Sequence, residues 1–503
     1  MTASAGVVRN VSTSYALRAL RALSVLALTP YLFRRLGLDG FGTWSVLFTV
    51  ATVFSLGEYG ATQGVTKHVS AHRDDPELLR ELLAAAMTFM LVLGVLALGG
   101  SALLAVAGGT LAAPGFEHEF QAGLVLIGAA MIVRFPGQVC GAALMGAQRY
   151  DLFNLAEAVT VIGFMAGAVA VVELGGGILA LAAAYSTSMV IGALAFVAML
   201  RRVDPRLVVG PRRVAARHRR AVSRFGGVTL LVDTMDFIAM RMDTLIVAAL
   251  RGAASASPVA AGARVTGGVQ ALILPFVSVL LPMVSELHAR GDREGIRRRL
   301  LVATRIAVQI TVVTAGALAL FADDLVRAWL GPAAPPVTAD IVVLLMLVQI
   351  AILAATPASK VLLGLGRLRA LRWLAIAEGA GNLALSLVLV WRLGAIGAAL
   401  GTLASSALLV PARIPLACRY TGCALRRLAR EALLPAARGA APALALMLVV
   451  RMTLEPGAAR LAAGLVTGAA AALLAGAGQL GPGRLLRAVR RPDPRPTVAE
   501  AGG

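Results

Sequence analysis

The chain has 503 residues, of which 58% are apolar and 15% are charged, and its mean hydropathy is +0.82. Soluble domains are about 45–50% apolar and about 25% charged, so this composition indicates a membrane protein and excludes disordered, fibrous and disulfide-scaffold chains. The 47 lysine and arginine residues outnumber the 26 acidic residues, but apolar runs divide them into short clusters. This pattern favours anionic lipid headgroups over nucleic acid as the partner.

Apolar windows long enough to cross a bilayer recur along the whole chain. A helix needs about 20 apolar residues to span about 30 Å of hydrocarbon, where lipid leaves the backbone no partner outside its own helix. The sequence therefore predicts an all-α, polytopic membrane protein with about fourteen transmembrane helices. The predicted spans are 12–33, 43–66, 81–107, 121–145, 153–174, 177–200, 225–249, 257–284, 302–321, 339–363, 372–392, 395–417, 437–454 and 459–478.

Basic residues are concentrated in the loops on one side of these spans. The loop at 201–224 holds nine arginines, whereas the loops at 108–120 and 175–176 contain neither arginine nor lysine. Short cytoplasmic loops collect positive charge, so we expect both termini to lie in the cytoplasm.

The same basic loop divides the chain into two lobes. The loops at 70–77 and 285–292, which follow the second and eighth spans, have similar sequences. This similarity favours two related six-helix lobes. The predicted units are an N-lobe at 1–200 (spans 1–6), a cytoplasmic inter-lobe loop at 201–224, a C-lobe at 225–417 (spans 7–12), a basic loop with two accessory helices at 418–478, and a disordered cytoplasmic tail at 479–503.

The sequence contains no enzyme, nucleotide or metal motif that we recognise. It has no Walker-type phosphate loop, and the run 364–366 lacks the third glycine of a dinucleotide loop. His68 and His72 lack the glutamate and the third ligand of a zinc-binding helix. We therefore expect no catalytic residue, no cofactor and no metal.

Several arginines fall inside the predicted spans, where a charge costs about 2.5–3.5 kcal/mol unless it has a partner or an aqueous cavity. Arg18 and Arg21 share one face of the first span, and the alternative is that both extend to the nearby headgroups. Arg134 lies near the midpoint of the fourth span and is the main candidate. Arg241 and Arg264 lie in the outer halves of spans seven and eight, where structural pairing is the alternative.

Acidic residues also lie within the spans. In span seven Asp236 and Asp243 point in nearly the same direction, and Asp233 lies about 60° away. Such a stripe either pairs with arginines of the other lobe or binds a proton or cation during transport. Glu58 in the second span is a further candidate. The residues assigned to the cytoplasmic boundary are Glu157, Glu378, Lys360, Arg305 and Arg413.

Several segments resemble a known family. The segment 30–45 (PYLFRRLGLDGFGTWS), followed by 56–60 (LGEYG), resembles the opening of bacterial polysaccharide-biosynthesis flippases of the multidrug/oligosaccharidyl-lipid/polysaccharide exporter superfamily. Further similar segments are 146–151, 241–247, 281–286 and 291–292. The resemblance implies two six-helix lobes around a central cationic cavity, alternating access, and two added C-terminal helices.

The resemblance also implies a function. Such a flippase moves a polyprenyl-(pyro)phosphate-linked oligosaccharide from the inner to the outer leaflet of the bacterial cytoplasmic membrane, for cell-surface polysaccharide synthesis. Arginine binds phosphate oxygens through paired N–H groups. The candidate phosphate-binding residues are Arg18, Arg21, Arg134, Arg241 and Arg264. The candidates for ion coupling or inter-lobe pairing are Glu58, Asp233, Asp236 and Asp243. Further expected partners are anionic membrane lipids, a proton or sodium ion, and other polysaccharide-assembly proteins.

Two alternative functions stay open. A cation-coupled multidrug exporter of the same superfamily typically carries an acid in the first span, and residues 12–33 contain none. A membrane glycan polymerase or ligase would place its catalytic groups in a large outer domain, but the predicted outer loops are short. Within the flippases, the lipid II branch is disfavoured because only Arg18 and Arg21 match its pattern of arginines and aspartates.

Overall fold

The computed structural model describes residues 3–72, 75–211 and 242–480. Within these ranges the chain is almost entirely helical and forms no strand. Eleven of the described helices are long and apolar enough to cross a bilayer. The prediction of an all-α, multi-pass membrane protein is therefore confirmed.

The first group of helices begins with α1 (Ala3–Ala71), whose two arms correspond to the predicted spans 12–33 and 43–66. The arms meet at Gly37, where a φ of 70° interrupts the helix. A side chain is strained at such a φ, and glycine is not. The other helices of this group are α2 (Pro76–Ala107), α3 (Glu117–Gly146), α4 (Tyr150–Glu173) and α5 (Ile178–Val203).

The second group follows a helical stretch at 242–251, which is the described part of the predicted span 225–249. Predicted span 257–284 consists of α7 and α8, and predicted span 395–417 consists of α13 and α14 with a short 3-10 turn between them. The helices of this group are α7 (Ala253–Ser278), α8 (Leu280–Ala289), α9 (Arg293–Leu320), α10 (Ala322–Leu330), α11 (Val337–Gly364), α12 (Leu368–Leu393), α13 (Ala395–Leu409) and α14 (Arg413–Thr421).

The short helix α10 lies where the sequence indicated only an outer loop. It is too short to span a bilayer, and it carries acids in its first turn and an arginine in its last turn, which suits the helix dipole. Gly331, with a φ of 97°, ends it.

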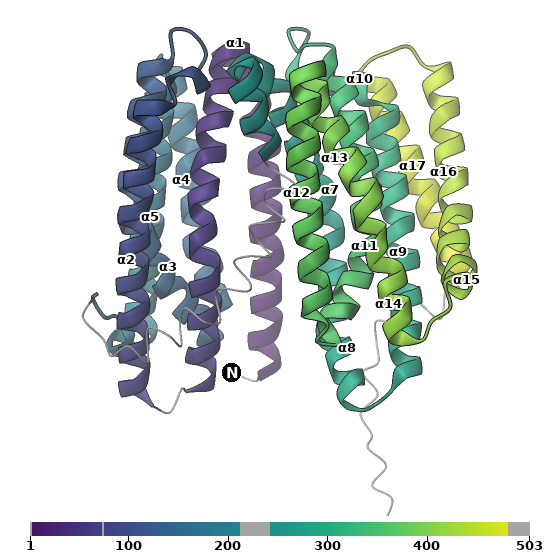
Figure 1. Ribbon diagram of the computed structural model, residues 1–503, viewed down its shortest axis with the longest axis horizontal. Coiled ribbons are helices and arrows are strands. Elements are labelled where there is room, and N and C mark those ends of the chain that lie inside the picture. Colours follow the sequence, from purple (N-terminus) through teal and green to yellow (C-terminus); the bar gives the residue numbers. More distant parts are fainter. Residues whose placement is uncertain (1–2, 73–74, 212–241, 481–503) are drawn as a thin grey trace, which may run out of the picture.

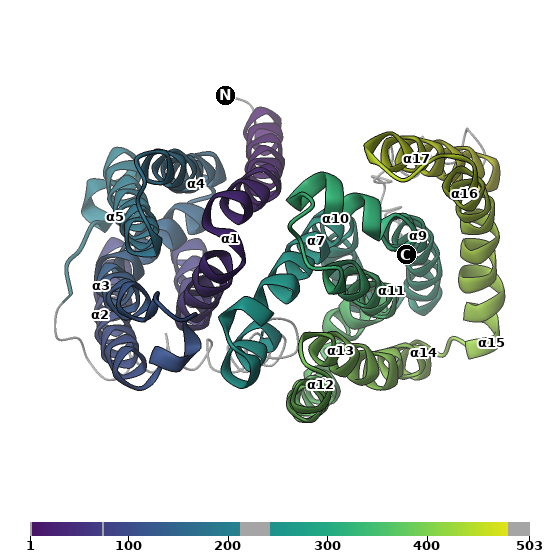
Figure 2. The same ribbon diagram turned by 90° about the horizontal axis from the view of Figure 1, so that it is seen from above.

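The two accessory helices α16 (Leu434–Thr453) and α17 (Ala458–Leu480) pack against α9 at the far side of the second group (Figure 2). Arg460 on α17 binds the buried carboxylate of Asp324 on α10 through two N–H groups, at 2.7 and 3.0 Å. The backbone N–H of Gly457 donates to the same carboxylate at 2.8 Å. Helix α17 is thereby fixed to α10.

Seen from above, α1–α5 gather into one body, and α7 and α9–α14 gather into another (Figure 2). Helix α1 makes the main contacts between these bodies, with α7 and α10. We call the end of the bundle where the two arms of α1 meet the outer end, and the end where α8 is followed by α9 the inner end, following the predicted orientation (Figure 1).

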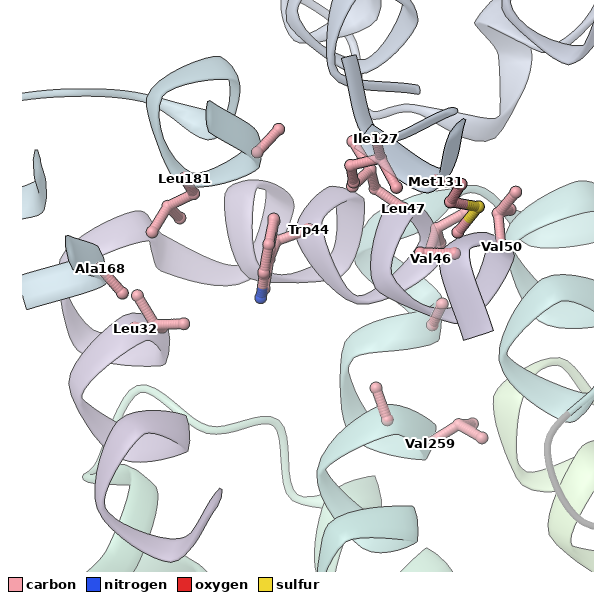
Figure 3. Close-up of a cluster of buried hydrophobic side chains, with 14 of the residues drawn as sticks. Leu32, Trp44, Val46, Leu47, Val50, Ile127, Met131, Ala168, Leu181 and Val259 are labelled. Carbon is pink, nitrogen blue, oxygen red and sulfur yellow. The ribbon is translucent and has the colours of Figure 1, made fainter. Parts of the chain in front are cut away.

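The core of the first body forms around the second arm of α1. Trp44 is 2% exposed, and its ring stacks on Phe164 at 5.9 Å between centroids. Leu47, Ile127 and Met131 belong to the same buried cluster and gather further along this arm (Figure 3). Since lipid is as apolar as these side chains, close packing rather than the hydrophobic effect holds such helices together.

Candidate functional site

A cavity of about 580 Å³ lies between the two bodies, with walls from α1, α7 and α11. Its lining extends from Leu26 and Ser45 on α1 to Ser278 on α7 and Lys360 on α11, toward the inner end. A cavity of this size is typical of small-molecule sites.

The cavity wall is basic. Four lining side chains are positively charged, and the described lining contains no acid. Three of them were predicted as phosphate-binding residues, namely Arg18 and Arg21 on α1 and Arg264 on α7. The fourth is Lys360, which the sequence assigned to the membrane boundary. These four charges face one cavity, where their fields add.

Arg264 reaches from α7 toward the second arm of α1. One terminal nitrogen donates to the carbonyl of Ala260 at 3.0 Å, and the other donates to the hydroxyl of Ser45 at 3.3 Å. The guanidinium carbon lies 4.9 Å from the ring centre of Phe41, which is a cation–π contact. Arg264 thus touches both walls of the cavity.

Arg21 lines the cavity and also forms an ion pair on the side away from it. Its Nη2 atom forms an ion pair with Glu157 on α4. The Arg21 side chain is 51% exposed, whereas that of Glu157 is 8% exposed. The Glu157 carboxylate is thus buried against an arginine of another helix, and its assignment to the membrane boundary stays a prediction.

Arg134 does not line this cavity, which corrects the expectation that it binds phosphate there. Its Nη2 atom lies 3.3 Å from Oε1 of Glu58, and both side chains are largely buried within the first body. The physical reason is that a charge near mid-membrane can be satisfied by a carboxylate of a neighbouring helix as well as by an aqueous cavity. Glu58 likewise pairs inside its own lobe and not between the lobes.

Asp243 is buried in a polar cluster of the second body. Its carboxylate accepts hydrogen bonds from Ser386 at 3.0 Å and from Thr402 at 2.5 Å. The amide of Asn382 donates to the Thr402 hydroxyl at 2.8 Å. Because these partners lie on α12 and α13, the expected pairing of Asp243 with the other lobe is wrong. A small cavity of about 20 Å³ adjoins the carboxylate, and Gln349 is among the residues that line it.

Asp233, Asp236 and Arg241 lie outside the described residues, as does almost all of the predicted tail. Their assignments stay predictions.

Two polar residues on one face of α4, Asn154 and Glu157, were the sequence pattern that could have predicted the pairing of α4 with α1. Asn154 precedes Glu157 by one helical turn, and its amide donates to the hydroxyls of Thr13 and Ser14 at 3.0 and 2.9 Å. Those residues lie on the same arm as Arg21. Two helices with matching polar faces tend to pair through them, because an unpaired polar group in lipid is costly.

The two bodies touch at the outer end. The Ser257 hydroxyl donates to the carbonyl of Leu38 at 2.6 Å, and a Cβ on Gly42 would overlap the carbonyl of Ala253. The indole of Trp329 on α10 donates to the carbonyl of Leu26 at 2.8 Å. Arg34 donates to carbonyls at the end of α10, the shortest of these bonds being 3.2 Å. The cavity is therefore closed from the outer end.

Comparison with solved structures identifies the fold. The lipid II flippase MurJ, in an inward closed conformation, has a TM-score of 0.74 at 13% identity, over 96% of this chain and 99% of that chain. A multidrug resistance MATE family transporter of the MOP superfamily, in an inward-facing conformation, has a TM-score of 0.68 at 15% identity, over 81% and 94%. An outward-facing MATE family transporter has a TM-score of 0.59 at 16% identity, over 83% and 95%.

At these identities the similarity shows that the chain shares the fold of these structures. No curated protein matches the sequence. A family model described as polysaccharide biosynthesis protein matches residues 7–288, which is more than half of the chain. The resemblance seen in the sequence is thereby confirmed, and the chain belongs to the polysaccharide biosynthesis protein family.

Proposed function

We propose that this protein is a flippase for a polyprenyl-(pyro)phosphate-linked oligosaccharide, which it moves from the inner to the outer leaflet of the bacterial cytoplasmic membrane. The observation that carries the proposal is the cavity between the two bodies, whose described lining has four basic side chains and no acid.

The chemistry of the cavity suits an anionic headgroup. The forks of Arg18, Arg21 and Arg264 can each offer two N–H groups to phosphate oxygens, and Lys360 adds a point charge. Hydroxyl and amide groups on the wall, such as Thr49 and Gln270, can bind sugar hydroxyls. The prenyl chain would remain in lipid between the bodies. The same positive field repels organic cations, which disfavours the multidrug alternative.

The direction of movement is supported by the closed outer end. The cavity extends toward the inner end, so a substrate would enter from the inner side in this conformation. The greater similarity to the inward-facing than to the outward-facing MATE structure agrees with this direction. Release to the outer leaflet would then require α1 to separate from α7 and α10 at the outer end.

We place ion coupling, if transport uses a gradient, at Asp243. The Asp243 carboxylate, the Thr402 hydroxyl and the Gln349 side chain line the adjoining cavity and carry the hard oxygen ligands that small cations prefer. The adjoining cavity of about 20 Å³ has room for about one small ion or water molecule. A proton on the carboxylate would be the alternative coupling ion. Asp233 and Asp236 stay further candidates.

Binding of inorganic pyrophosphate to the full chain in lipid nanodiscs tests the headgroup site. Arg264→Ala removes charge-assisted hydrogen bonds worth about 1.5–3 kcal/mol each, so we expect the Kd to rise about tenfold or more. Arg80→Ala is the control, because Arg80 is exposed near the inner end and outside the cavity. Isothermal titration calorimetry gives both values. Absent binding to the wild type, or equal loss in both variants, would refute the site.

Transport is tested with a short polyprenyl diphosphate-linked fluorescent disaccharide in proteoliposomes. Its movement between leaflets is measured by quenching of the outer leaflet with dithionite. We expect Arg264→Ala to slow flipping strongly and Arg80→Ala to leave it unchanged. Equal rates with and without the wild-type protein would contradict the proposed function.

A further inference from the structure

Arg21 belongs to two sites at once, because it lines the cavity and pairs with a buried acid. Its side chain is half-exposed, whereas the Glu157 carboxylate lies behind it and outside the described lining. Arg21 is thus a cavity arginine whose charge is largely neutralised by a carboxylate when the cavity is empty.

Glu157 also lies near the second buried pair of the first body. It is close enough to both Glu58 and Arg134 for electrostatic interaction. The two acids and two arginines together are electrically balanced. Any anion that binds Arg21 from the cavity therefore adds negative charge beside an arrangement that is already neutral.

We propose that Glu157 is a positioning residue that competes with the substrate phosphate for Arg21 and so limits how tightly the cavity holds the headgroup. This inference rests on the proposed function, since it assigns a role within the same site. When phosphate binds, Arg21 shifts its hydrogen bonds from the carboxylate toward the cavity. When phosphate leaves, the ion pair between Arg21 and Glu157 forms again.

The physical reason for such a competitor is release. A flippase must release the diphosphate at the outer leaflet. If no cation of the cavity were paired with an acid, the diphosphate would bind too tightly to be released. Arg21 has a charge-assisted hydrogen-bond partner in both states, so the guanidinium stays paired throughout the exchange. The buried Glu157 carboxylate loses its partner while phosphate is bound, and this cost opposes binding and favours release.

The chain offers a matched control on the same two helices. Glu173, at the outer end of α4, pairs with Arg35 of α1 at 2.6 Å, and both side chains are about half-exposed. Neither residue lines the cavity. Glu173→Gln therefore removes a carboxylate from the same helix pair without touching the proposed exchange.

The test is pyrophosphate binding to the full chain in nanodiscs. Glu157→Gln keeps the shape of the side chain and removes its charge, so we expect the Kd for inorganic pyrophosphate to fall about tenfold, which is about 1.4 kcal/mol. In proteoliposomes the same variant should lower both the half-saturating substrate concentration and the maximal flipping rate. Glu173→Gln should change none of these values.

A second variant keeps the test decisive if Glu157→Gln folds poorly. Glu157→Asp retains the charge but withdraws the carboxylate from Arg21, so we expect a smaller tightening in the same direction. A Kd that is unchanged or raised in both variants overturns the inference, because Glu157 would then only hold Arg21 in place.

The outcomes also separate this inference from the proposed function. If the wild type does not bind pyrophosphate, or if Arg264→Ala does not weaken binding, the proposed function fails. If Arg264→Ala weakens binding and the Glu157 variants do not tighten it, only the role of Glu157 fails.

Discussion

The closed outer end makes a sharp prediction for Gly42. A Cβ at this position would overlap the carbonyl oxygen of Ala253 and lie 2.7 Å from both the Ala253 carbonyl carbon and the Ser257 hydroxyl. Ordinary contact begins at 3.4 Å, so relieving the two 2.7 Å contacts alone requires about 0.7 Å of separation between α1 and α7, and relieving the closer overlap with the carbonyl oxygen requires more. Most of the overlap is with backbone, which no rotamer change can relieve.

The expected consequence of Gly42→Ala is a shift toward opening at the outer end. Overpacking of this kind costs about 1–3 kcal/mol, which corresponds to a change of about 5- to 150-fold in the ratio of closed to open molecules. Only the conformation with α1 against α7 bears this cost, because the helices are apart once the outer end opens. The variant should therefore remain folded and populate the open conformation.

Pulsed electron paramagnetic resonance measures this shift. Spin labels at Asp39→Cys and Ser255→Cys, with the three native cysteines replaced, report the distance between the bodies at the outer end. We expect Gly42→Ala to add or enlarge a long-distance population. Gly57→Ala is the control, since its Cβ would meet only a Leu93 side chain, at 3.5 Å. An unchanged distance distribution in Gly42→Ala would refute the reasoning that this approach closes the outer end.

Two further predictions concern the buried charges. Asp243→Asn removes the charge from its polar cluster. We expect flipping in proteoliposomes to lose any stimulation by a sodium or proton gradient, while the pyrophosphate Kd stays within about twofold of the wild-type value. Stimulation that persists in this variant would exclude Asp243 from coupling. Arg134→Ala leaves the Glu58 carboxylate buried without its partner, which costs about 3–5 kcal/mol. We expect this loss of stability to lower the Tm and to abolish complementation. A variant with wild-type Tm and activity would contradict the structural role of Arg134.

Positions along the helices were predictable from the sequence, because apolar length and loop charge report depth in the membrane directly. Thus the windows at 12–33 and 43–66 became the arms of α1, and Arg18 and Arg21 could be assigned to one helical face. Lys360 was assigned only to the membrane boundary, because the sequence does not tell how far a cavity extends along a helix.

Contacts between helices were less predictable. Arg134 and Glu58 are 76 residues apart, and Asp243 and Thr402 are 159 residues apart. A single sequence shows which residues share one face of a helix, but it does not show which other helix packs against that face. Helix α10 was missed for a different reason, since nine residues are too few to produce a membrane-spanning window.

Helix α10 joins parts of the chain that look separable in the sequence. The carboxylate of Asp324 is 2% exposed and is satisfied by Arg460 and Gly457, both of which belong to the accessory pair. A shortened protein that ended after α14 would keep this acid without its counter-charge on the helix that also holds Trp329 against α1. The last two helices are therefore not a dispensable appendage, and a twelve-helix form of this sequence would need a neutral residue in place of Asp324.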